Sequence, residues 1–456
     1  MKGFVPTSEF LVDRMVAKLF RGRPPQKNDT LLDPGCGEGA FIAGVLRWST
    51  GHQTAVPHII GIESDPRFIK ATKKRFSSIS SVTIQEDDFL TSPDCKYDYV
   101  IGNPPYVSIT RLSEQERSAF RQKYATAKGR FDLYLLFFER ALNCLKPNGR
   151  LVFITPEKFL YVTTAQPLRL MLAKTSVEEI HLVDENVFGE LATYPTITTI
   201  ANCRTSGLTR IIFRNGRVRD VRLRSDALSW MPLIHGQADK ITGPTLNDIC
   251  VRISCGVATG ADAAFVVKAV DPELKAFAYS TIAGQEMSLG DTALSPKKFM
   301  LIPYSDKGRL LSETELGKLG DYLRQPQRRE MLLKRSCVVR KPWYAFHETP
   351  PLAEILRPKI LCKDITRNSF FVVDETGMLV PRHSVYYIVP KDPSRIYEIA
   401  DYLNSGTVRS WLISHCQRAT NNFLRLQSHV LKQLPIPEEL LVAQAFDIPH
   451  AEKISA

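Results

Sequence analysis

The sequence predicts an α/β protein, in which a doubly wound, seven-stranded sheet is followed by a second, mixed α+β domain. In the first half, short β-branched runs alternate with amphipathic helical patterns, as in sheets with helices on both faces. Past about residue 205 the segments become irregular. The 456 residues also exceed one ordinary globular domain. We therefore expect domains at residues 1–240 and 241–456, with a linker region at Asp239–Thr245.

The strands of the first domain are expected wherever an apolar run ends in turn or acidic residues. The clearest helix has Leu133, Leu136, Phe137, Arg140, Ala141 and Cys144 at helical spacing and ends in the turn Lys146–Gly149. The short gap between the last two strands favours an antiparallel pair at the sheet edge. The seven expected strands are Thr30–Gly35, His58–Ser64, Ser81–Asp87, Tyr97–Gly102, Arg150–Thr155, Val177–Val183 and Thr196–Asn202.

Composition narrows the classes of function. The nine cysteines form no Cys-x-x-Cys pair and no cluster with histidine at zinc spacing, so we expect no metal. No stretch approaches the ~20 apolar residues of a membrane span, so we expect a cytoplasmic protein without a membrane partner. The net charge of +12 favours a polyanionic partner, although an ordinary solvated basic surface gives the same charge.

Three consecutive strands end in residues suited to one small ligand. Leu31–Phe41 carries three glycines where the first strand turns into a helix, which lets backbone approach a ligand closely. Glu63 ends the second strand, where a carboxylate can accept from two ribose hydroxyls. Asp88 and Phe89 follow the third and suit an adenine amino group and ring. Each acid alone is better explained as a strand end or a helix cap. The glycine order departs from Gly-x-Gly-x-x-Gly, which argues against a dinucleotide.

The fourth strand runs into Asn103-Pro104-Pro105-Tyr106. An exocyclic amine is a poor nucleophile because its lone pair is delocalised, and acceptors on both N–H groups favour a localised lone pair. Asn103 Oδ1 and the Pro104 carbonyl are two such acceptors, and the prolines keep the loop rigid. Tyr106 offers a flat face for the ring that carries the amine. A proline-rich turn with a surface tyrosine is the alternative interpretation.

In this order the motifs resemble the S-adenosylmethionine-dependent amino-methyltransferases, specifically the gamma-type adenine-N6 DNA methyltransferases of restriction-modification systems. Phe4–Val12 resembles the N-terminal cofactor motif of that family, and it precedes the glycine turn and the Asn-Pro-Pro-Tyr loop as that type requires. The resemblance covers roughly residues 4 to 204. It implies the methyltransferase form of the sheet and site-specific methyl transfer to N6 of an adenine flipped out of duplex DNA.

The resemblance also implies roles for individual residues. Asn103, Pro104 and Tyr106 would carry catalysis, and Phe188 would stack on the other side of the flipped base, with Tyr194 as the alternative. A core phenylalanine is the competing interpretation of Phe188. The residues expected to contact S-adenosylmethionine are Thr7, Asp33, Gly35, Glu63, Ser64, Asp88, Phe89, Asn103, Pro105 and Phe137.

The second domain resembles a target-recognition domain more thinly, with Ile253–Phe265 as its opening and Asn421–Phe423 to Leu434–Pro437 as its end. We expect it to bind double-stranded DNA, because an enzyme that extrudes an adenine must hold the strands. The implied protein is a monomer with a possible cognate restriction endonuclease. The preferred DNA-binding patch is Lys334-Arg335, Arg340-Lys341 and Trp343-Tyr344, with an ordinary solvated face as the alternative.

Two other functions are compatible with the sequence. Amino-methyltransferases that act on RNA or on protein glutamine also resemble this chain at Asn-Pro-Pro-Tyr. A DNA-binding protein with a vestigial methyltransferase fold is the second alternative, and the intact Asp33, Glu63, Asp88 and Asn103 argue against it.

Overall fold

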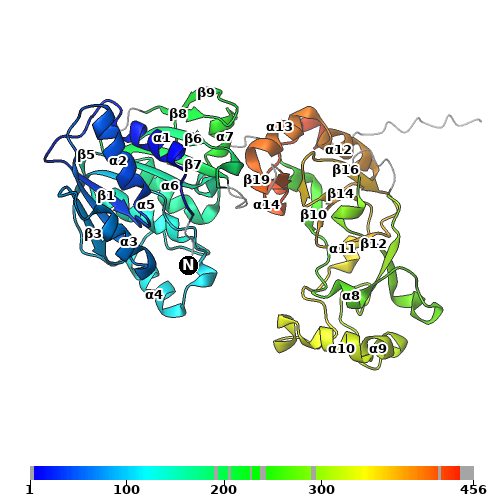
Figure 1. Cartoon of the computed structure of the whole chain (residues 1–456). Helices are drawn as coiled ribbons and strands as arrows, with labels where there is room; N and C mark the ends of the chain where they lie inside the picture. The colour runs from blue at the N-terminus through cyan, green and yellow to red at the C-terminus, as the bar shows by residue number, and fades with distance from the viewer. Residues whose placement is uncertain are drawn as a thin grey trace, which may run out of the picture. The chain divides into compact units, whose positions relative to one another are not determined.

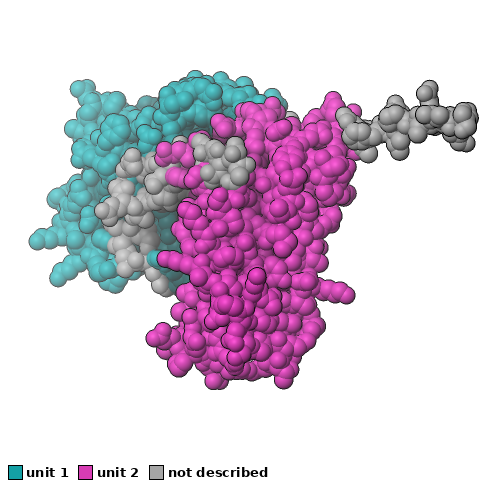
Figure 2. All heavy atoms as spheres, turned by 90° about the vertical axis from the view of Figure 1, so that its right-hand side faces the viewer, with its two compact units in different colours: residues 1–240 teal, residues 241–456 magenta. Residues whose placement is uncertain are grey.

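The computed structural model describes residues 5–188, 194–203, 207–225, 229–236, 243–288, 294–419 and 423–441. The chain forms two compact units, residues 1–240 and 241–456 (Figures 1 and 2). Each unit has its own hydrophobic clusters. The predicted linker residues 239–242 lie outside the described residues.

Unit 1 is built on one large sheet with the order β3-β2-β1-β4-β5-β7-β6-β8-β9. The strands β3, β2, β1, β4 and β5 are parallel, whereas β7 is antiparallel to both β5 and β6. The strands are β1 (Thr30–Pro34), β2 (His58–Glu63), β3 (Val82–Glu86), β4 (Tyr97–Gly102), β5 (Leu145–Pro156), β6 (Ser176–Leu182), β7 (Pro195–Ala201), β8 (Thr209–Ile212) and β9 (Val218–Val221).

The doubly wound α/β class is confirmed, but the count of seven strands in the sheet is wrong. β8 and β9 extend it, β8 parallel to β6 and β9 antiparallel to β8, so the β6–β7 pair is antiparallel as expected without forming the edge. β9 lies within the basic stretch 214–224. Most of its residues are exposed, so the sequence there lacks the alternation of apolar and polar residues that predicts a strand. β5 also begins five residues earlier than expected, because the Lys146–Gly149 turn lies inside it, with Asn148 at φ +61°.

Helices cover both faces of this sheet. Successive side chains of the central strands point to opposite faces, so the core consists of two hydrophobic clusters, one on each face. In β4, Val100 faces one cluster and Ile101 the other, and in β5, Phe153 and Ile154 divide in the same way. Residues of α1, α2 and α3 join the cluster of Ile101 and Ile154, and residues of α5, α6 and α7 join that of Val100 and Phe153. The helices are α1 (Glu9–Phe20), α2 (Ala40–Gly51), α3 (Pro66–Phe76), α4 (Glu114–Lys123), α5 (Leu133–Asn143), α6 (Gln166–Leu172) and α7 (Met231–His235).

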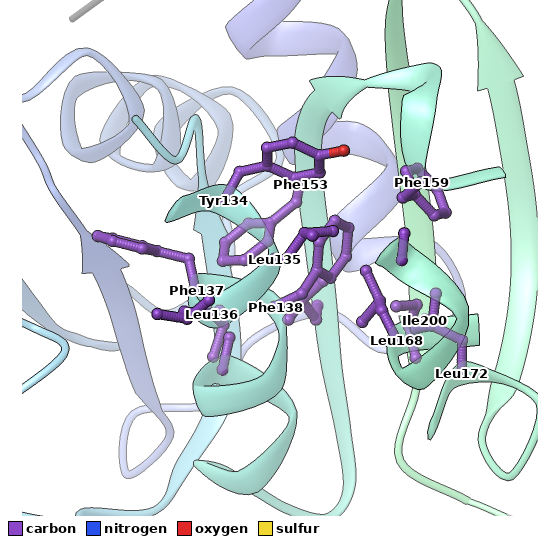
Figure 3. Packing of buried hydrophobic residues seen from close by; sticks show 14 of the residues in the cluster. Tyr134, Leu135, Leu136, Phe137, Phe138, Phe153, Phe159, Leu168, Leu172 and Ile200 are labelled. Carbon is purple, nitrogen blue, oxygen red and sulfur yellow. The ribbon is translucent and has the colours of Figure 1, made fainter. Parts of the chain in front are cut away.

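The helix predicted from Leu133 onward is α5, and its residues are buried on several sides. Phe138 packs against Phe153 and Phe159, with ring centroids 5.2 and 5.6 Å apart. Phe137, one position earlier, extends away from that group (Figure 3). The consequence is that one helix supplies both the core of the sheet and a ring for the cavity described below.

Unit 2 is mixed α+β, as predicted. Its sheets have the orders β10-β18-β14-β16, β11-β13-β12-β17 and β15-β20-β19, and most of the pairs are antiparallel. Its strands are β10 (Cys250–Cys255), β11 (Val266–Val267), β12 (Ala278–Ile282), β13 (Lys298–Leu301), β14 (Lys359–Lys363), β15 (Ile365–Thr366), β16 (Phe371–Asp374), β17 (Val380–Pro381), β18 (Val385–Pro390), β19 (Gln417–Ala419) and β20 (Phe423–Arg425). Its helices are α8 (Asp262–Phe265), α9 (Gly317–Arg324), α10 (Pro326–Leu333), α11 (Leu352–Ile355), α12 (Ile396–Leu403), α13 (Gly406–His415) and α14 (Ser428–Lys432).

The beginning and the end of unit 2 pair with each other. The Leu246 N–H donates to the Leu434 carbonyl at 2.8 Å, and the Ile436 N–H donates to that of Pro244 at 3.0 Å. The predicted closing segment Leu434–Pro437 therefore returns to the start of the unit, while Asn421 and Asn422 lie outside the described residues.

Over the described residues, no helix combines the length and apolarity that a membrane crossing requires.

Candidate active site

A cavity of about 350 Å³ lies in unit 1 where β1, β2 and β4 end. This volume falls within the range of small-molecule sites, and its position is where open α/β sheets bind ligands. Eight residues expected at a cofactor site line it, namely Thr7, Gly35, Glu63, Ser64, Asp88, Asn103, Pro105 and Phe137. Asp33 and Phe89 do not.

The glycine turn between β1 and α2 brings backbone to the cavity wall. Gly35 has φ +85°, a conformation that side chains rarely adopt, and its N–H donates to the Ile62 carbonyl at 2.7 Å. Gly39 has φ +79°, and a Cβ there would lie 2.4 Å from the Phe76 ring. Positive φ and close approach therefore both require glycine in this turn.

Glu63 is buried and held from two sides. One carboxylate oxygen accepts from the Gly37 N–H at 2.8 Å, and the other accepts from the Asp65 N–H at 2.7 Å. Each oxygen keeps a further lone pair that can accept from a ligand hydroxyl. The carboxylate is therefore fixed at the cavity wall with accepting capacity to spare.

Asp33 lies beneath the glycine turn, away from the wall of the cavity. It is completely buried, and neither carboxyl oxygen has a hydrogen-bond partner among the described residues. Burial, and secondarily the charge of Glu63, raises the pKa of Asp33 well above its ordinary value. Asp33 is not among the residues that line the cavity, and a Cβ at Gly102 would lie 3.4 Å from its Oδ1.

At the end of β3, Asp88 lines the cavity but Phe89 does not. The Leu90 N–H donates to Asp88 Oδ1 at 2.9 Å, and this tight turn directs Leu90 to the cavity. The Phe89 ring packs against Phe137, with centroids 5.3 Å apart, and Arg140 covers it at 5.2 Å. Phe89 therefore supports the ring of Phe137, which itself lines the cavity.

Asn103, which lines the cavity at the end of β4, is held by two hydrogen bonds. Its Nδ2 donates to the Val5 carbonyl at 3.0 Å and to Thr7 Oγ1 at 3.1 Å. Its Oδ1 is buried and has no hydrogen-bond partner among the residues that the structure describes. A buried acceptor without a partner costs free energy, which a ligand that donates a hydrogen bond there would recover.

The residues after Asn103 form a rigid rim. Pro104 is buried and Pro105 lines the cavity. The Tyr106 hydroxyl donates to the Ile154 carbonyl at 3.3 Å, which ties the ring to β5. Burial raises the pKa of Tyr106 far above its ordinary value, so this phenol stays protonated at neutral pH.

The aromatic expected opposite Tyr106 is buried instead of facing an open slot. Phe188 ends the 3₁₀ turn Glu185–Phe188 and is 9% exposed within the cluster that holds Val5 and Phe41. Its ring meets that of Tyr106 edge to face at 6.3 Å. The ring of the alternative, Tyr194, faces the Arg214 guanidinium at 5.1 Å. The described structure therefore supports the core interpretation of Phe188.

Sequence reasoning missed one wall of the cavity, formed by Phe41 of α2 and by the segment before α5. Leu112, Glu116 and Phe120 line the cavity from that segment. The capping box of Ser113 and Glu116 at the start of α4 was a readable signal for the helix. Nothing in the pattern indicated which of its faces meets a cavity.

The basic patch expected in unit 2 is only partly exposed. Arg335 is buried, and its guanidinium donates to the Thr259 carbonyl at 2.7 Å, while Tyr344 is also buried. Both therefore serve packing. Lys334 and Arg340 are exposed, as is Arg329 nearby.

Among the described residues there is no group of three side chains suited to holding a metal ion.

The chain matches two protein families. Residues 55–188 match the Eco57I restriction-modification methylase family, and residues 314–436 match the TaqI-like C-terminal specificity domain. A type II methyltransferase of Pseudomonas aeruginosa, M.PaeR7I, is 28% identical over 78% of this chain and 67% of its own length. The type II methyltransferase M.XhoI of Xanthomonas vasicola is 26% identical over 77% of this chain and 70% of its own.

The fold as a whole is also shared with a solved structure. The type IIL restriction-modification enzyme MmeI, determined in complex with DNA, superposes with a TM-score of 0.63 at 13% identity. The match covers 93% of this chain and 64% of that one. A likeness at this identity shows the fold, which here includes both units.

The sheet, the glycine turn and the cavity fit a methyltransferase that uses S-adenosylmethionine. The two family matches, one in each unit, and the similarity to type II methyltransferases support a restriction-modification methylase, a site-specific DNA methyltransferase.

Proposed function

We propose that this protein transfers a methyl group from S-adenosylmethionine to N6 of an adenine in duplex DNA, as the modification enzyme of a restriction-modification system. The observation that carries this proposal is the buried Oδ1 of Asn103, an acceptor without a partner at the cavity where β4 ends. An exocyclic amino group supplies the hydrogen-bond donor that this oxygen lacks.

The residues of the loop then serve the amine. Asn103 Oδ1 and the Pro104 carbonyl each accept one N–H, which localises the nitrogen lone pair for attack. The two prolines fix the backbone, so these acceptors are in place before the reaction. Tyr106 provides the face on which the base stacks, and its hydroxyl, tied to Ile154, holds the ring in position.

The cavity fits S-adenosylmethionine by the chemistry of its lining. Glu63 would accept from the ribose hydroxyls, Asp88 from the adenine amino group, and Phe137 and the glycine turn would border the methionine part. When bound, the cofactor supplies an electrophilic methyl group on a sulfonium. The remaining work, orienting the amine and excluding water, falls to Asn103, Pro104 and the apolar wall.

We propose unit 2 as the part that recognises DNA. Segment 324–341 carries seven cationic side chains and one acidic one, and its exposed members suit phosphate groups. We further propose a monomeric, cytoplasmic protein and, because the chain resembles type II methyltransferases, a separate cognate endonuclease as its partner.

Transfer of labelled methyl from S-adenosylmethionine to unmethylated genomic DNA, structured RNA and a protein lysate, followed by nucleoside analysis, tests the proposal. We expect N6-methyladenine from DNA alone. Detection of N4-methylcytosine would agree with the chemistry proposed for the loop but would show that the substrate base is cytosine. Label found only in RNA or protein would overturn the substrate, and no label at all would favour a vestigial fold.

The variant Asn103→Ala is the control that connects this activity to the loop. We expect it to lose turnover and keep cofactor affinity, because Asn103 acts mainly in the transition state. Calorimetric titration with the cofactor and single-turnover kinetics measure the two effects separately. Unchanged turnover in this variant would remove the central claim.

A further inference from the structure

We infer that Thr7 is a positioning residue for Asn103. Its hydroxyl, together with the Val5 carbonyl, holds the Asn103 amide in the one orientation that presents Oδ1 to the substrate amine. The inference rests on the proposed function, because it assigns a second residue to the same reaction.

Two acceptors on one side of Asn103 determine the orientation. A carbonyl oxygen can only accept, so the amide edge that faces Val5 at 3.0 Å must be Nδ2. Thr7 Oγ1, at 3.1 Å, accepts from the same nitrogen. Both Nδ2 hydrogens are thus used, and Oδ1 is left on the opposite side as the buried atom without a described partner. A reversed amide would place a donor where the substrate amine must donate.

The two acceptors are themselves fixed in place. The Val5 side chain is buried in a hydrophobic cluster of unit 1. Two residues after Thr7, α1 begins at Glu9 and packs on α2 and the sheet. Residues 5–8 are therefore held at both ends across the β4 loop, so the position of the Thr7 hydroxyl follows from the fold.

The Thr7 hydroxyl also connects the loop to the cavity. Thr7 lines the cavity together with Asn103. Because its oxygen accepts from Asn103, its own hydrogen remains to donate, and its position on the wall makes a cavity ligand a suitable acceptor. One hydroxyl then orders the Asn103 amide from the wall of the cavity.

The variant Thr7→Val tests this role, because valine keeps the β-branched shape and lacks the acceptor. We expect kcat at saturating cofactor to fall about ten-fold, as the loss of one hydrogen bond predicts, whatever change in cofactor Kd accompanies it. Thr7→Ser retains the hydroxyl and should restore most of the rate. Ser8→Ala, in an exposed neighbour whose side chain makes no capping hydrogen bond, controls for disturbance of the segment.

A readout independent of turnover is the ¹⁵N signal of the Asn103 side-chain amide, identified by its disappearance in Asn103→Ala. We expect Thr7→Val to shift this signal and to speed its hydrogen exchange, and Thr7→Ser to leave both near the wild-type values. An unshifted signal in Thr7→Val, or full turnover despite a shift, would overturn the inference. A loss confined to the cofactor Kd would make Thr7 a cofactor ligand only and would also overturn it.

The activity of the wild-type protein separates this inference from the proposed function. If wild-type protein methylates DNA while Thr7→Val retains the wild-type kcat, only the role of Thr7 is refuted. If the wild-type protein transfers no methyl group to DNA, the proposed function fails, and the catalytic role of Thr7 fails with it.

Discussion

The rings of Tyr106 and Phe188 meet edge to face, with centroids 6.3 Å apart and planes inclined at 72°. Stacking of a base between two aromatic rings requires the planes of the two rings to be roughly parallel. The observed arrangement therefore has no slot between these rings. In the proposed function, Tyr106 alone therefore serves as the stacking platform.

The first prediction concerns that platform. We expect Tyr106→Ala to lower kcat/KM on DNA by an amount equivalent to ~1–3 kcal/mol, because a stacking surface for the base is lost. Tyr106→Phe is the matched control, since it keeps the ring and removes only the hydrogen bond to Ile154. Equal rates for the alanine and phenylalanine variants would refute the stacking role.

The second prediction treats Phe188 as a core residue. Truncation of a buried phenylalanine leaves a cavity, so we expect Phe188→Ala to destabilise the fold by roughly 3–5 kcal/mol. Phe188→Leu should recover most of the loss. Denaturant unfolding measures it. An alanine variant of wild-type stability but poor methyl transfer would show instead that the ring serves the substrate.

The third prediction concerns the cofactor. We expect Glu63→Gln to weaken S-adenosylmethionine binding about ten-fold to a hundred-fold, the range for lost hydrogen bonds to a charged group. Glu86→Gln is the control, because Glu86 ends the neighbouring strand β3 in an exposed position. Calorimetric titration gives both constants. Equal affinity in the two variants would remove Glu63 from the cofactor site.

The fourth prediction is a dependence of stability on pH. Burial, and then the charges of Arg14 and Lys18, lower the pKa of His181 from 6.5 to about 4. Because the folded value lies below the unfolded one, the stability from neutral His181 is complete above about pH 6.5 and declines as the pH falls toward 4. We expect about 2 kcal/mol of loss from this group at pH 5.

The variant His181→Gln isolates that effect. Urea unfolding at pH 7.5 and pH 5 should show a smaller loss of stability in the variant than in the wild-type protein. The same pH dependence in both proteins would show that His181 does not titrate as described.

The fifth prediction concerns DNA binding. We expect the double variant Arg329→Ala/Arg340→Ala to weaken binding to all duplexes about equally and to reduce the salt slope of log K by about two. Lys268→Ala, an exposed lysine of the same unit outside segment 324–341, is the control. Fluorescence anisotropy over a salt series measures the slope, and an unchanged slope would exclude this segment from phosphate contact.

The strands that carry the site were predictable because each ends in turn or acidic residues that local sequence displays. β1, β2 and β4 begin and end within two residues of the predicted bounds. β8 and β9 were missed, because short exposed strands lack a sustained apolar alternation. The early start of β5 was missed because Asn148 can adopt a positive φ, so a turn sequence continues within a strand.

The sequence by itself determined the order of the motifs and which residue types meet at the ends of the strands, because these depend on spacing along the chain. Only the tertiary structure decided which of those residues face the cavity. Asp33 turns inward, Leu90 replaces Phe89 at the wall, and Phe188 joins the core. It also brought Val5 and Thr7 to Asn103. They lie 98 and 96 positions from Asn103 along the chain, and they orient its amide. Side-chain direction and long-range hydrogen bonds depend on packing between distant segments, and local sequence does not encode that packing.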